Sequence, residues 1–65
     1  MTSKVIVTNV SVSESKKHIL FHTAVGYFAL KTPGFVTDAQ VRSARLAIGQ
    51  AINPEEHGMI HMIVI

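Results

Sequence analysis

The chain has 65 residues, of which 48% are hydrophobic and 15% charged, with a net charge of +2 and no cysteine. A chain of this length makes one domain, residues 1–65, and the lack of cysteine excludes disulfides and thiolate metal sites. No stretch reaches the ~18 apolar residues of a membrane span, and the N-terminus lacks the apolar run of a signal peptide. We therefore expect a cytoplasmic protein that does not bind a membrane. The mild positive charge permits contact with an anion without demanding nucleic acid.

Three segments have the composition of β-strands. Residues 4–12 are rich in β-branched side chains, and the polar residues 13–17 connect them to a second segment. The second segment, His18 to Lys31, is about twice the common strand length and has Gly26 near its middle, where a bulge or bend would fit. A helix is the alternative here, but the β-branched and aromatic residues favour a strand. The third strand is the apolar run from Met59 to Ile65.

One segment reads as an amphipathic helix, from Thr37 to Ile52. Thr37 and Gln40 have the spacing of a capping box, in which each side chain satisfies a backbone N–H at the helix start. Asn53-Pro54 marks the end, because the residue before a proline is disfavoured in the α conformation. The apolar stripe that would face a sheet consists of Val41, Ala44, Ile48, Ala51 and Ile52.

The element order is therefore β-β-α-β, and we expect a small α+β domain. Its three-stranded sheet would carry one helix packed on one face. The first two strands would form an antiparallel hairpin, and the strand–helix–strand unit would place the third strand parallel to the second through a right-handed crossover. The preferred strand order is 3-1-2.

Each predicted strand carries apolar side chains on both faces, whereas one helix covers only one face. Exposing several hundred Å2 of apolar surface forfeits on the order of 10 kcal/mol, which is comparable with the whole stability of such a domain. The domain is therefore expected to oligomerise through its other sheet face, with itself or with another protein. The candidate interface residues are Phe21, Val25, Tyr27, Leu46, Met62 and Val64. Leu46 lies off the helix stripe, so it is either a scattered exposed leucine or part of a second contact surface.

Three residues alternate at the start of the last strand and could bind copper or zinc: His57, Met59 and His61. Residues four apart on one strand face are separated by about 13 Å, so one ion would need ligands from neighbouring strands or subunits. The alternative is ordinary surface or hydrogen-bonded histidines.

Four basic residues could bind an anion, namely Lys16 and Lys17 in the loop between the first two strands and Arg42 and Arg45 on the helix. Oligomer symmetry would multiply them around a ligand at a subunit interface. The alternative is a solvated loop and arginines that lie along the helix surface.

No catalytic or cofactor motif is present, and the four carboxylates do not form a recognisable acid–base pair, so an enzyme is not expected. The sequence predicts a small, non-enzymatic, homo-oligomeric protein-binding module of the inhibitor or adaptor type, such as viruses and mobile elements encode. The alternative is an oligomer that sequesters a small anionic ligand, such as a nucleotide, between its subunits.

Overall fold

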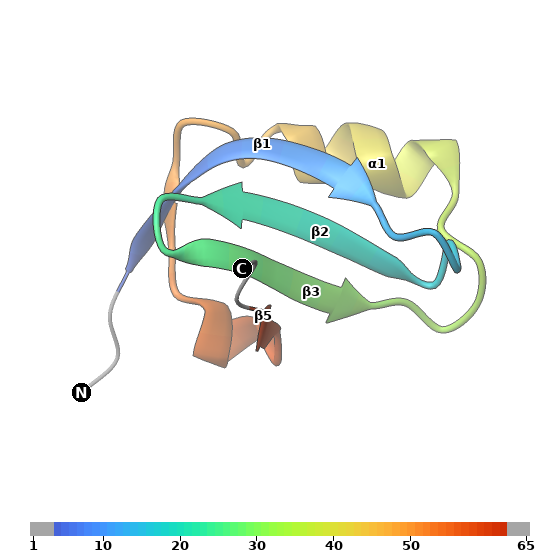
Figure 1. The fold of residues 1–65 in the computed structure, drawn as a ribbon. Helices are drawn as coiled ribbons and strands as arrows, with labels where there is room; N and C mark the ends of the chain where they lie inside the picture. The colour runs from blue at the N-terminus through green and yellow to red at the C-terminus, as the bar shows by residue number, and fades with distance from the viewer. Residues whose placement is uncertain (1–3, 63–65) are drawn as a thin grey trace.

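The computed structural model describes residues 4–62 and shows a curled five-stranded antiparallel sheet with one short helix (Figure 1). The sheet has the order β4-β1-β2-β3-β5. Its strands are β1 (Val5–Val12), β2 (His18–Thr23), β3 (Gly26–Lys31), β4 (Ala51–Ile52) and β5 (Ile60–Met62), and the other elements are the helix α1 (Asp38–Arg45) and the 3-10 helix η1 (Pro54–His57). The domain is small and α+β, but the expected three-stranded sheet in the order 3-1-2 is wrong. All neighbouring strands pair antiparallel, including the last strand.

The single long strand predicted for His18 to Lys31 is in fact the hairpin of β2 and β3. The Thr23 hydroxyl donates to the carbonyl of Gly26 and accepts from the N–H of Val25, which holds the two-residue loop. Gly26 has a φ of +120°, which glycine alone adopts readily. Where the sequence predicted a bend within one strand at Gly26, the chain in fact reverses its direction. Ala24 and Val25 gave no sign of it, because hairpin turns usually carry Asn, Asp or Gly.

The first predicted strand is confirmed as β1, which contains a bulge at Thr8 and Asn9. The Thr8 hydroxyl donates to the backbone carbonyl of His22, and Oδ1 of Asn9 accepts the N–H of Val10. The extra residue places Val7 and Val10 on the same face, where both are buried.

The predicted start of the helix is confirmed. Oγ1 of Thr37 accepts the N–H of Gln40 at 3.2 Å, and Oε1 of Gln40 accepts the N–H of Thr37 at 2.9 Å. The predicted end at Ile52 is wrong, since α1 ends at Arg45.

The helix ends early because the residues after it pair with β1. The N–H of Gly49 donates to the Val7 carbonyl at 2.7 Å, and the N–H of Val7 donates to the Gln50 carbonyl at 3.0 Å. Gly49 has a φ of +83°, which turns the chain out of the helix. β4 then continues the ladder, with Ile52 opposite Val5.

The last predicted strand is confirmed only in part. η1 precedes it, and Gly58 ends η1 in the left-handed conformation with a φ of +66°. β5 then runs antiparallel to β3, with His61 opposite Phe28. Residues 63–65 of the predicted strand lie outside the described residues.

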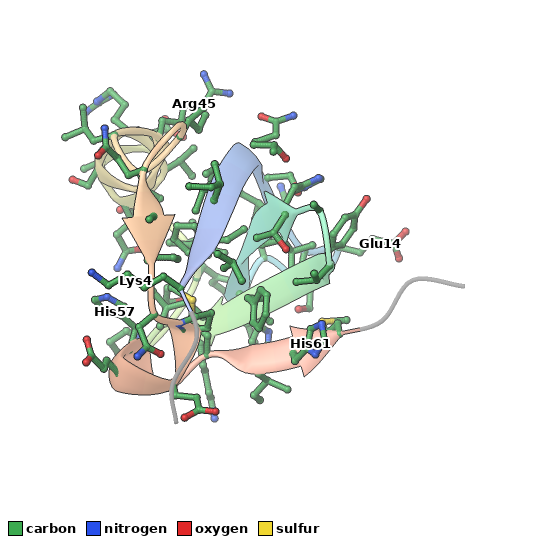
Figure 2. All side chains as sticks on the ribbon, turned by 90° about the vertical axis from the view of Figure 1, so that its left-hand side faces the viewer. Lys4, Glu14, Arg45, His57 and His61 are labelled. Atoms are coloured by element: carbon green, nitrogen blue, oxygen red, sulfur yellow. The ribbon has the colours of Figure 1, made fainter. Side chains whose placement is uncertain are left out.

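The sheet curls so that α1, β4 and η1 lie over one side, which we call the inner face (Figure 2). Phe21 and Phe28 are directly opposite each other and both point to this face. The buried core on the inner face consists of Val7, Val10, Ile19, Phe21 and Phe28. The other side of the sheet is called the outer face below.

The capping box predicts a measurable contribution to stability. Replacing Thr37 by Ala removes the acceptor for the Gln40 N–H, and we expect the free energy of unfolding to fall by about 1 kcal/mol in urea denaturation. Thr37→Ser keeps a hydroxyl at the cap and should lose only a few tenths of this amount. An equal loss in both variants would show that the cap bond contributes nothing.

Candidate functional site

None of the described helices or strands covers the outer face of β2, β3 and β5, and Figure 1 turns this face of β2 and β3 toward the viewer. The register places Leu20, Ala29 and Ile60 in one row across the three strands. Tyr27 and Met62 stand side by side in the next row. We call these five residues the outer patch. Ala29 is only 4% exposed, but Ile60 is 60% exposed and Met62 is 45% exposed, so the patch presents apolar side chains to solvent at β5.

The second row also contains one polar side chain, that of His22, which lies on β2 beside Tyr27. The ring of His22 lies 4.2 Å from the ring of Tyr27, and its Nε2 is 2.6 Å from the Ser11 hydroxyl. His22 is therefore held within its own sheet. The rows of the outer patch contain no Asp, Glu, Lys or Arg, and Lys31 and His18 pair at the far end of the hairpin.

The predicted interface residues do not all lie together. Tyr27 and Met62 belong to the outer patch, and the exposed Val25 lies beside it in the β2–β3 loop. Phe21 is only 5% exposed and belongs to the core, because the hairpin reverses the face that a single long strand gives it. Leu46 is 80% exposed at the C-terminal end of α1, on the helix side of the sheet. Val64 lies outside the described residues.

Sequence reasoning missed three members of the patch, Leu20, Ala29 and Ile60, because the partner of each strand was not known. Leu20 meets Ala29 only across the hairpin. Ile60 meets Ala29 only because β5 pairs with β3. The alternation of apolar residues in the last segment was a signal for Ile60, but it did not say which face would stay open.

A groove of about 600 Å3 opens on the inner face, between α1 on one side and η1 on the other. Phe21 and Leu30 form part of its floor. Ala44 lines the helix wall, and Met59 lines the opposite wall. The groove exists because the helix side contributes small side chains above the large residues of the sheet.

Polar residues border this groove without a carboxylate among them. Among the described residues they are Lys31, Thr32, Gln40, Ser43 and His57, and the register of β3 directs the Lys31 side chain to the outer face. Oε1 of Gln40 accepts the N–H of Thr37, so the Gln40 side chain offers its amide N–H groups. The hydroxyl of Thr32 is hydrogen-bonded to backbone carbonyls. The Gln40 amide N–H groups are therefore hydrogen-bond donors at the groove, and the Ser43 and His57 side chains can also donate.

The predicted metal ligands are not arranged as an alternating strand. His57 lies in η1, Met59 packs against the core, and His61 lies on β5. Figure 2 shows His57 and His61 well apart. Nε2 of His61 donates to the Val25 carbonyl at 2.9 Å, and its ring stacks on Phe28 with centroids 4.5 Å apart. Within residues 4–62, no group of three His, Cys, Asp or Glu side chains could hold a metal ion.

The four predicted anion-binding residues fall into two separate pairs. Arg42 and Arg45 line a shallow cleft beside α1, which the Asp38 carboxylate also lines. Lys16 and Lys17 lie in the β1–β2 loop, where the Lys17 ammonium is 5.8 Å from the centroid of the Phe35 ring. Neither lysine lines the cleft of the two arginines.

In the part of the chain that the structure describes, no helix has the length and apolar character needed to cross a membrane. Comparisons with protein-family models, with curated proteins and with solved structures find no match to this chain. Its function is therefore inferred from its own residues and geometry.

Proposed function

We propose that this chain is a non-enzymatic binding module that self-associates through the outer patch. The observation that carries the proposal is the exposure of Ile60 and Met62 on a sheet face that no described element covers. Apolar side chains gathered on one open face are typical of a protein interface, whereas scattered ones are not.

The chemistry of the patch favours a second copy as the partner. In a two-fold dimer the same residues meet each other, so a charged residue near the axis would face its own like charge. The rows of the outer patch contain no charged residue, and the Lys31 end of the hairpin lies away from β5. Two copies can therefore meet at this face without charge repulsion. A charged partner surface would find no charged residue in the patch with which to form an ion pair.

The size of the face sets the strength of the expected dimer. β2 and β3 have six residues each, so the face measures about 20 Å along the strands and about 14 Å across three of them. Its projected area is well below the ~800 Å2 that each partner contributes to a standard interface. We therefore expect a dissociation constant in the micromolar range and a concentration-dependent equilibrium.

The two edges of the sheet are protected to different degrees, and the less protected edge, β5, belongs to the outer patch. β4, at one edge of the sheet, has only two residues and is followed by Asn53 and the buried Pro54, which limit further pairing. β5, at the other edge, carries neither Pro nor Lys within its described residues. A partner copy on the outer face would shield Ile60 and Met62 at this less protected edge.

Sedimentation equilibrium over a range of about 10 µM to 1 mM tests the proposal. We expect the average mass to rise from 7.1 kDa toward twice that value as the concentration increases. Ile60→Lys should hold the mass at that of the monomer while leaving the thermal transition nearly unchanged, because the side chain is exposed within one chain.

Leu46→Lys is the matched control, since it places the same charge at another exposed apolar residue on the helix side. It should leave the dimer intact. If Leu46→Lys yields the monomer and Ile60→Lys does not, the interface lies at the helix end and the proposal is wrong.

A further inference from the structure

We propose that the groove between α1 and η1 binds a small anionic amphiphile, namely an unbranched alkyl chain that ends in a carboxylate. The site is on the inner face, so it is separate from the self-association surface on the outer face. Its volume of about 600 Å3 lies within the range of pockets that hold small ligands.

The interior of the groove suits an apolar ligand body. Backbone groups of β2 and β3 along the floor pair with each other across the hairpin, so they offer little to a polar ligand. The side chains that project from the floor, Phe21 and Leu30, are apolar. In the described part of the chain, every buried side-chain nitrogen or oxygen atom has a hydrogen-bond partner.

The walls favour a flexible chain over a flat ring. Ala44 and Ala47 on the helix side leave space without offering aromatic surface for stacking. Met59 on the opposite side has an unbranched, adaptable side chain that fills irregular space. An alkyl chain can follow such a surface by rotating about its own bonds.

The border of the groove favours a negative head group. Among the described residues no Asp or Glu lines it, and its ionisable side chain is that of His57, since the register of β3 directs the Lys31 side chain to the outer face. Gln40 uses its oxygen in the helix cap and so presents N–H donors. A carboxylate accepts hydrogen bonds from such donors, whereas an ammonium head would find no carboxylate partner there.

Calorimetric titration of the full chain with octanoate, decanoate and dodecanoate, each below its micelle concentration, tests the inference. Each added methylene group should tighten binding about fourfold until the groove is filled, since one buried CH2 contributes ~0.8 kcal/mol. Decanol should bind more weakly than decanoate, because it lacks the charge. No measurable binding of dodecanoate, or equal binding of decanol and decanoate, would overturn the proposal.

Variants locate the site. Ala44→Leu fills the groove from the helix side, so it should abolish decanoate binding while the thermal transition stays the same or rises. His57→Gln should weaken decanoate binding about two- to fivefold without affecting decanol. Arg42→Gln is the matched control, because Arg42 lies on α1 outside the groove, and it should bind decanoate like the unmodified chain. Ligand binding that survives in Ala44→Leu, or that Arg42→Gln weakens as much as His57→Gln does, would place the site elsewhere.

The outer patch provides an independent control. Ile60→Lys should bind decanoate as the unmodified chain does, because Ile60 does not line the groove. Loss of decanoate binding in this variant would mean that the ligand sits at the dimer interface, and the groove assignment would be wrong.

Discussion

Phe21→Ala is expected to leave the domain largely unfolded at 25 °C. Phe21 is 5% exposed and packs in the core opposite Phe28, and the truncation of such a phenylalanine costs about 3–5 kcal/mol. Domains of this size have a total stability of only about 3–5 kcal/mol, so little would remain. Circular dichroism and urea denaturation measure the loss directly.

Phe35→Ala is the matched control, because the same atoms are removed from a side chain that is 69% exposed. Its loss should be about 1 kcal/mol or less, which includes the contact with the Lys17 ammonium. The comparison also separates two accounts of Phe21. If Phe21 were an interface residue, Phe21→Ala would stay folded and would change only the oligomeric state.

Gly26→Ala is expected to destabilise the domain by about 2–3 kcal/mol and to weaken the pairing of β5. Gly26 has a φ of +120°, and a Cβ there would lie 2.9 Å from the Met62 carbonyl oxygen and 3.1 Å from Nε2 of His61. The first contact is with backbone, which cannot rotate away, so β5 must shift. The His61 bond to the Val25 carbonyl should weaken with it.

Thermal denaturation gives the stability change, and amide hydrogen exchange should show faster exchange in β5 than in β1 and β2. Gly34→Ala is the control, since no atom of residues 4–62 lies within 4 Å of a Cβ built at Gly34 and its φ is not positive. It should be close to neutral. A Gly26→Ala variant as stable as Gly34→Ala would mean that the β2–β3 loop or the position of β5 differs from the one described.

The sequence predicted correctly those features that depend only on residues close together in the chain. The capping residues Thr37 and Gln40 lie at the helix start, and the β-branched run of residues 4–12 forms β1. The predictions failed where pairing with a distant segment of the chain determines the secondary structure. The amphipathic pattern continues past Arg45, but the backbone of Gly49 and Gln50 pairs with Val7 instead of extending the helix.

The candidate surfaces were predictable only in part, because faces depend on strand register. A single strand from 18 to 31 puts Phe21 and Phe28 on opposite sides, whereas the two-residue loop puts both in the core. This change moves apolar surface from the outer face to the inner one. It leaves the outer patch smaller than the sequence suggested and creates the floor of a groove that no sequence pattern indicated.

The most direct test of self-association is a nuclear magnetic resonance experiment on a millimolar mixture of isotope-labelled and unlabelled chains, which detects only contacts between different copies. We expect such contacts between the Ile60 and Met62 methyl groups of one copy and the Leu20 and Tyr27 side chains of the other. Contacts confined to Leu46 and its neighbours, or no contacts between copies at this concentration, would contradict the account.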